Sequence, residues 1–146
     1  MKPVHTIAAC ALVAVGSVAA IAEAKPAPTV GLRHTSLGEV LVSASGRTLY
    51  EFSKDHTNKD TCTATAGCTE TWPPLRASGK PTAGAGVRGS LLSTITLSGG
   101  AKQVTYAGHP LYLYSGDSGP GETSYVGARQ FGGSWDALNA SGRAVK

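Results

Sequence analysis

The sequence repeats itself at an offset of 62 residues, and this repeat restricts the chain to a fold made from two copies of one unit. The segment LVSASGRTLYEFSKD at 41–55 aligns without a gap on QVTYAGHPLYLYSGD at 103–117. Valine, glycine, leucine, tyrosine, serine and aspartate recur at the same places. Trp72 and Trp135 stand at the far ends of the two copies, at positions that correspond to within one residue.

Each copy has the pattern of antiparallel strands joined by tight turns. The dipeptides Ser45-Gly46 and Ala107-Gly108 predict hairpin turns, because glycine adopts positive φ without strain. The strands expected before these turns centre on residues 40–42 and 104–106, and the return strands cover 49–52 and 111–114. Further strands are expected at 29–35, at 91–97 and, after the long loops, around Trp72 and across 134–138.

The predicted fold is all-β: two tandem antiparallel β-meanders packed as one small domain, with long glycine-rich loops. The 19 glycines and 8 prolines of the chain fit frequent turns and argue against long helices. Aromatic residues at alternate strand positions share one face, so the two meanders are expected to enclose them. The repeats are placed at about 29–75 and 91–138, with a Gly/Ala/Ser/Pro-rich linker at about 76–90, inside a single domain at 25–146.

Residues 1–24 have the three-part layout of a secretory signal. Lys2 supplies the positive charge, residues 6–22 are apolar or small, and Ala22-Glu23-Ala24 is a small-x-small cleavage site. A membrane anchor is the alternative, but the run is short and alanine-rich. Lipidation of Cys10 is a second alternative, although this cysteine opens the hydrophobic stretch rather than closing it. The prediction is an exported protein, periplasmic or extracellular, cleaved near Ala24 and membrane-bound only if lipidated.

The remaining cysteines, Cys62 and Cys68, predict a disulfide, because an even number of nearby cysteines in an exported chain normally pairs. The net charge of +4 permits weak attraction to anionic surfaces. The basic residues are scattered along the sequence without a run, which argues against a nucleic-acid site.

Paired motifs give the chain a family resemblance. Tyr50-x-Phe52-x-x-Asp55 and Tyr112-x-Tyr114-x-x-Asp117 resemble the Tyr-x-aromatic-x-x-Asp signature of a bacterial secreted-repeat family that includes predicted lipoproteins. Segments 71–75, 108–112, 116–121 and 131–135 resemble its pattern as well. The resemblance implies a bacterial envelope or extracellular protein and implies no established activity. The chain departs from the lipoprotein pattern because no lipobox stands at the cleavage site.

The repeated aspartates are the main candidate site residues. Asp55 and Asp117 each end a return strand and open a long loop, where a carboxylate commonly accepts hydrogen bonds from backbone N–H groups. The sharper alternative makes them symmetry-related ligands for a metal or a polar small molecule, or a carboxylate pair in an enzyme. The motif residues Tyr50, Phe52, Asp55, Tyr112, Tyr114 and Asp117 are therefore either structural or ligand-binding.

A metal or haem site is a second alternative, although no cofactor is expected. The loop after Asp55 holds His56, Asp60 and both cysteines, a set that suits zinc or copper if the thiols are reduced. His109, in the second hairpin turn, is a candidate haem or copper ligand. The second copy has neither histidine nor cysteine in the loop that corresponds to the first.

The function favoured by these patterns is a non-enzymatic secreted or periplasmic module that binds or supports a component of the bacterial cell envelope. The sequence lacks a clustered nucleophile or acid–base set, so it does not favour an enzyme, and no catalytic residue is assigned. The partner is an unidentified envelope component or a small ligand, not a nucleic acid. The alternative function is a metal- or haem-linked redox or carrier protein that uses its histidine, tyrosine and aspartate residues.

Overall fold

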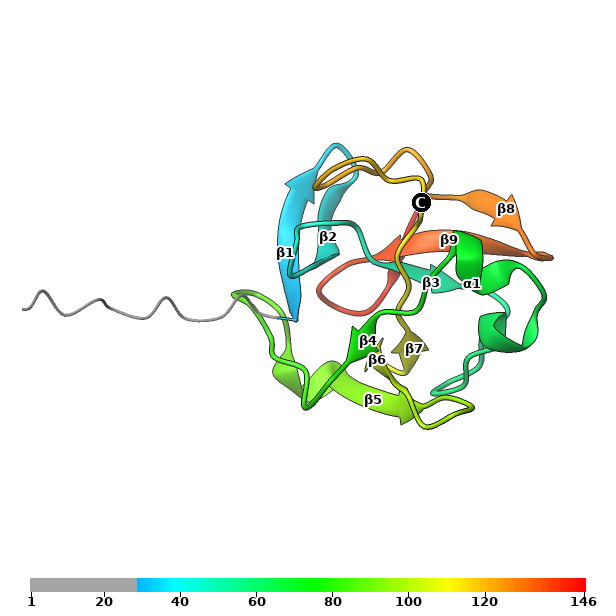
Figure 1. Cartoon of the computed structure of the whole chain (residues 1–146). Helices are drawn as coiled ribbons and strands as arrows, with labels where there is room; N and C mark the ends of the chain where they lie inside the picture. Colours follow the sequence, from blue (N-terminus) through cyan, green and yellow to red (C-terminus); the bar gives the residue numbers. More distant parts are fainter. Residues whose placement is uncertain (1–28) are drawn as a thin grey trace, which may run out of the picture.

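The computed structural model describes residues 29–146, so the predicted signal sequence and Cys10 lie outside the described part of the chain (Figure 1). Short strands and long connections make up this part. The strands are β1 (Val30–Thr35), β2 (Gly38–Ser43), β3 (Tyr50–Phe52), β4 (Arg76–Ala77), β5 (Leu92–Thr96), β6 (Lys102–Tyr106), β7 (His109–Pro110), β8 (Ala128–Gln130), β9 (Gly133–Leu138) and β10 (Ala144–Val145). The helical pieces are η1 (Cys62–Ala64), α1 (Cys68–Thr71) and η2 (Gly89–Leu91). The predicted all-β fold class is confirmed.

Three antiparallel sheets are formed, and two of them draw strands from both repeats. Strands β1 and β2 form a hairpin, which Figure 1 shows in blue at one side of the molecule. The second sheet has the order β10-β9-β3, with β8 also paired to β9. The third has the order β4-β6-β5, with β7 paired to β6. Strand β3 of the first repeat thus lies beside β9 of the second, and β4 lies beside β6.

The exchange of strands follows a two-fold pattern centred on Tyr50 and Tyr112. The backbone N–H of each of these tyrosines donates to the carbonyl of the other, with both N···O distances at 2.9 Å. Tyr50 is also paired with Ala137 from the end of the second repeat. Tyr112 is correspondingly bridged to Pro74 from the end of the first. Each return segment therefore lies between its counterpart and the closing segment of the other repeat.

Two predicted strands are wrong in detail. The residues around Trp72 do not form a strand, because the helical turn α1 immediately precedes this tryptophan. The return strand expected at 111–114 is not a continuous strand either: it makes only isolated bridges at Tyr112. Prolines explain this interruption, since Pro110 immediately before the segment and Pro73 and Pro74 on its neighbour have no N–H to donate to a ladder.

The hairpins also differ from the expected pairing in the first repeat. The principal partner of β2 is the preceding strand β1, and the return segment contacts β2 only near the turn, where Val42 is bridged to Thr48. The chain then leaves β2 to reach β9. The second predicted turn is present: Ala107 and Gly108 have φ of 50° and 83°, as a two-residue primed turn requires.

The interior contains one mainly aliphatic cluster, one aromatic cluster and a small third cluster of Val40, Val42 and Ala137. The aliphatic cluster is built by Val30, Leu41, Leu49, Val104, Tyr106, Leu111 and Leu138. The aromatic cluster contains Tyr50, Phe52, Trp72, Tyr112 and Trp135 together with both cysteines. Each cluster includes residues of both repeats, so neither repeat completes a core alone.

Candidate functional site

The two tyrosines at the centre of the repeat exchange their hydrogen bonds between the copies. The Tyr112 hydroxyl donates to Asp55 Oδ2 at 2.6 Å, and the Tyr50 hydroxyl donates to Asp117 Oδ2 at 3.0 Å. The aspartate of each motif therefore accepts a bond from the tyrosine of the other motif. Asp55 also accepts bonds at 2.8 Å from the backbone N–H and the hydroxyl of Thr61, so its carboxylate holds its own loop as well.

Burial sets the protonation of these groups. Desolvation raises the pKa of Asp55, against the opposing effects of the bonds from Tyr112 and Thr61. Desolvation likewise raises the pKa of Asp117 from 3.8 to about 6, against the bond from Tyr50. The pKa values of Tyr50 and Tyr112 are raised chiefly by burial and further by the adjacent carboxylates. Both phenols therefore stay protonated and act as hydrogen-bond donors, not as bases.

A stack of aromatic rings lies beside these tyrosines and also alternates between the repeats. Trp72 and Trp135 are parallel, with ring centroids 4.2 Å apart. Phe52 stacks on the outer face of Trp135 at 4.1 Å, and Tyr114 lies against Trp72 at 4.5 Å. Tyr50 meets Trp72 edge-on. Offset and edge-on pairs add stabilisation beyond the area they bury.

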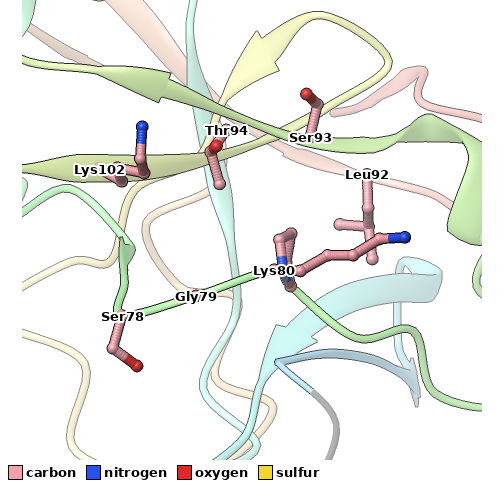
Figure 2. A pocket seen from close by; sticks show the side chains of 8 residues that line it. Ser78, Gly79, Lys80, Leu92, Ser93, Thr94 and Lys102 are labelled. Carbon is pink, nitrogen blue, oxygen red and sulfur yellow. The ribbon is translucent and has the colours of Figure 1, made fainter.

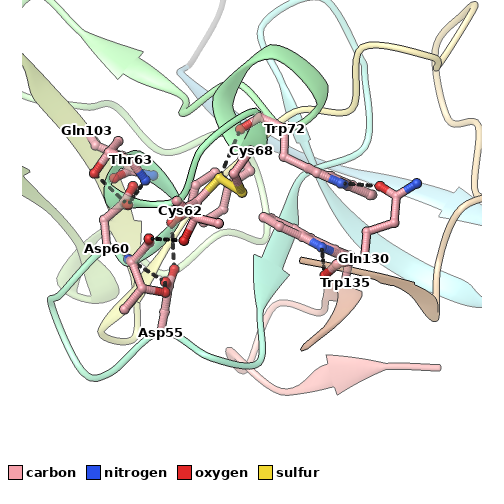
Figure 3. Close-up of a disulfide and its surroundings, with 12 residues drawn as sticks. Asp55, Asp60, Cys62, Thr63, Cys68, Trp72, Gln103, Gln130 and Trp135 are labelled. Atoms are coloured by element: carbon pink, nitrogen blue, oxygen red, sulfur yellow. Dashed lines mark hydrogen bonds between the residues drawn. A yellow bond between two sulfur atoms is a disulfide. The ribbon is translucent and has the colours of Figure 1, made fainter. Parts of the chain in front are cut away.

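The indole N–H groups converge on one residue that the sequence prediction missed. Figure 3 shows Gln130 beside both indoles: Trp72 Nε1 donates to its side-chain oxygen at 2.7 Å, and Trp135 Nε1 donates to its carbonyl oxygen at 3.3 Å. Gln130 lies on β8, outside the aligned segments 41–55 and 103–117, so the comparison of the two copies did not identify it. It satisfies two donors that burial would otherwise leave unpaired.

The predicted disulfide is confirmed. Cys62 and Cys68 are bonded, and both are fully buried. Figure 3 shows the bond between Trp72 and the Asp55 loop, so it fixes the loop that Asp55 opens against the aromatic stack. The thiols are consumed by this bond and are not available as metal ligands.

The residues that follow the two hairpin turns, Arg47 and His109, occupy corresponding positions in the repeats. Each contacts the other repeat, but through a different kind of interaction. Arg47 donates to the carbonyl oxygens of Tyr114 at 2.6 Å and of Asp117 at 3.0 Å. His109, at the corresponding position, has Nδ1 2.5 Å from Oε2 of Glu51. The hydrogen bond to Glu51 raises the pKa of His109, against the effect of burial. The sequence analysis missed Arg47 and Glu51, although the alignment of Arg47 with His109 was a usable signal.

The candidate metal residues lie near each other without forming a ligand set. His56, His109 and Asp55 line a pocket of about 110 Å³. Over residues 29–146, histidine, cysteine, aspartate and glutamate side chains form no group of three that could hold an ion. His109 is instead held by Glu51, and His56 is exposed.

The described residues include no helix long and apolar enough to cross a membrane.

Comparison with known proteins identifies the two repeats. Residues 31–76 and 93–139 each match the family described as "Secreted repeat of unknown function". These segments cover more than half of the chain, and each begins close to the first strand of its repeat. No curated protein and no solved structure matches the chain.

Proposed function

The chain belongs to the family of the secreted repeat of unknown function, and from this premise we propose that it is a non-enzymatic module that binds or supports a component of the bacterial cell envelope. The proposal includes export through the signal sequence at residues 1–24, with cleavage near Ala24. The folded domain is then a rigid unit held together across its two repeats.

One observation carries this proposal: the motif residues are bonded to each other across the two repeats. Both tyrosine hydroxyls donate to aspartates, and both aspartates are occupied by these donors. A pair of catalytic carboxylates would need access to substrate, whereas Asp117 is only 7% exposed and each aspartate faces a separate tyrosine. The motif therefore serves to join the repeats, and contacts with other molecules fall to the outer loops and sheet faces.

The proposal is tested by sedimentation of the secreted protein with isolated envelopes. Purified, fluorescently labelled protein is mixed with envelopes from a strain that lacks the gene, and the pellet is measured over a range of concentrations. We expect saturable binding that unlabelled protein competes away. Binding that rises linearly without competition, together with unimpaired envelope integrity in the deletion strain, would contradict the proposal.

A metal- or haem-linked carrier is the second candidate, and the pocket shared by Asp55, His56 and His109 favours it. Untagged protein isolated from the native host would then contain stoichiometric metal or show a haem absorption band. Replacement of His109 by Ala should abolish that signal, whereas replacement of the exposed His34, which lies on β1, should not. Substoichiometric metal and a featureless visible spectrum would eliminate this candidate.

A further inference from the structure

The acidic and basic residues are segregated along the chain. Between Glu70 and Asp117 there is no aspartate or glutamate, whereas four lysines and arginines occur there: Arg76, Lys80, Arg88 and Lys102. This segment supplies the whole of the β4-β6-β5 sheet. A single ion pair forms within residues 29–146, between His109 and Glu51, so no carboxylate neutralises these four cations. The segment therefore gives this side of the molecule a positive charge with no acid of its own.

We propose that the pocket between this sheet and the loop that follows β4 holds a site for a linear phosphate-bearing polymer of the envelope, bound between Lys80 and Lys102. This inference rests on the proposed envelope role and names its ligand class. A pocket of about 380 Å³ lies between the two lysines, within the volume range of small-molecule sites. The loop 78–81 after β4 forms one wall, and β5 and β6 form the other.

The side chains of this pocket suit phosphate oxygens. Figure 2 shows Ser78 and Lys80 on the loop, Lys102 on β6, and Ser93 and Thr94 on β5. Thr94 lies on the same face of the sheet as Lys102, whereas Ser93 alternates to the opposite face. Ammonium groups attract the anionic oxygens, and hydroxyls donate further hydrogen bonds to them. Every charged residue that lines the pocket is a lysine.

The sheet also brings the two lysines together from distant parts of the sequence. Ala77, three residues before Lys80, is paired with Lys102 in the ladder between β4 and β6. On its other side Lys102 is paired with Thr96 of β5, and its ammonium donates to the Thr96 hydroxyl at 3.0 Å. Asp60 lines a separate pocket that includes Thr96, and its Oδ1 accepts hydrogen bonds from the backbone N–H and the hydroxyl of Thr63.

A polymer fits this pocket better than a bilayer surface does. A peripheral membrane site combines basic residues with apolar side chains that enter the acyl boundary. The large hydrophobic residues that are exposed within the described chain are Leu37 and Tyr125, and neither lines this pocket. A hydrophilic chain that carries repeated phosphates needs only the charges and hydroxyls that are present.

The test compares two double variants with the same net charge. Lys80→Gln/Lys102→Gln removes the pocket lysines, and Lys54→Gln/Lys146→Gln removes two exposed lysines elsewhere. Binding of inorganic polyphosphate to the purified secreted protein is followed by fluorescence anisotropy, with neutral dextran as the uncharged probe. We expect affinity for polyphosphate to fall about tenfold or more in the pocket variant, since charge-assisted contacts are lost there, and less than about twofold in the control.

Three results would overturn the site. The first is an equal loss in both variants, which would indicate general charge attraction. The second is binding of dextran as tight as that of polyphosphate. The third is binding to phosphatidylglycerol vesicles without binding to polyphosphate, which would replace the polymer with a lipid headgroup.

Sedimentation with envelopes separates this inference from the proposal on which it rests. If the wild-type protein binds envelopes and the pocket variant binds them equally well, the proposed envelope-binding role is retained and the phosphate site is wrong. If binding to envelopes and binding to polyphosphate fall together in the pocket variant alone, the site is supported. If the wild-type protein does not bind envelopes at all, the envelope role itself is contradicted.

Discussion

At the scale of single residues, the recurring tyrosine and aspartate join the repeats through two reciprocal hydrogen bonds. Tyr112 Oη lies 2.6 Å from Asp55, and Tyr50 makes the equivalent contact with Asp117. The two aspartates differ in their other partners. The Asp55 carboxylate also accepts two bonds from Thr61, whereas Arg47 donates to the backbone carbonyl of Asp117. Loss of either tyrosine hydroxyl removes one donor, from the half-buried carboxylate of Asp55 or from the buried carboxylate of Asp117.

Replacement of Tyr112 by Phe is expected to lower the free energy of unfolding by about 1–3 kcal/mol, because the shielded Asp55 carboxylate loses a charge-assisted bond. Urea denaturation followed by tryptophan fluorescence measures the change. Tyr125→Phe, on an exposed ring, serves as the control and should shift stability by less than about 0.5 kcal/mol. An unchanged midpoint in Tyr112→Phe would show that the bond contributes nothing to folding.

Asp117 gives the domain a pH dependence of defined sign. Its folded pKa of about 6 lies above the ordinary value of 3.8, so the folded state binds more protons than the unfolded state between these values. Stability is therefore expected to decrease as pH rises from about 4 to about 6, by on the order of 2 kcal/mol from this residue. Thermal melts in Asp117→Asn should show a smaller decrease, because the raised pKa of Asp55 still contributes one of the same sign. A decrease of equal size in wild type and variant would assign it to other groups.

At the scale of elements, the exchange of strands matters more than the individual hairpins. The return strand β3 pairs with β9, and the corresponding segment at Tyr112 pairs with Pro74. The first repeat adds the disulfide-closed turn between Cys62 and Cys68, which the second repeat lacks. This turn packs against the tryptophan stack and replaces part of the strand expected there.

Removal of the disulfide by the double substitution Cys62→Ala/Cys68→Ala should lower the free energy of unfolding by roughly 2 kcal/mol, as expected for the closure of a short loop. Chemical denaturation of wild type and variant measures the difference. A reducing agent should destabilise the wild type by a similar amount and leave the variant unaffected. Sensitivity of the variant to the reductant would mean that the effect does not come from this bond.

At the scale of the whole molecule, the two repeats form one cooperative unit. Strand β3 of the first repeat is paired with β9 of the second, and β4, directly after the first repeat, is paired with β6. All three hydrophobic clusters draw on both repeats. A separated repeat would expose unpaired strand edges and half of each cluster. The same arrangement collects the cations of the segment between Glu70 and Asp117 on a single sheet.

Fragments that divide the chain in the exposed loop at Arg88 are therefore expected to be unfolded separately and to fold on mixing. Fragments 25–88 and 89–146 are compared by NMR, each alone and as an equimolar mixture. Dispersed amide signals should appear only in the mixture. A fragment that is dispersed alone would contradict the interdependence of the repeats, and the uncut domain serves as the folded reference.

The positions where sequence prediction failed have a common physical origin. The residues that recur in both copies identified Tyr50, Asp55 and their counterparts. Their recurrence does not specify which copy supplies the hydrogen-bond partner of each. Gln130 lies outside the repeated core, and the strand at 111–114 was interrupted by prolines on a neighbouring segment that lies far away in sequence. Pairing between distant segments depends on the packing of the whole chain, which periodicity within one segment does not report.

The sequence by itself determined the all-β class, the division into two repeats, the second hairpin turn and the disulfide, because each follows from local spacing or from the chemistry of nearby residues. Only the tertiary structure decided that tyrosine and aspartate exchange partners between copies, and that Lys80 and Lys102 line one pocket. These contacts join residues 22 to 67 positions apart in the chain, and their proximity is set by strand pairing and by burial of the aromatic rings.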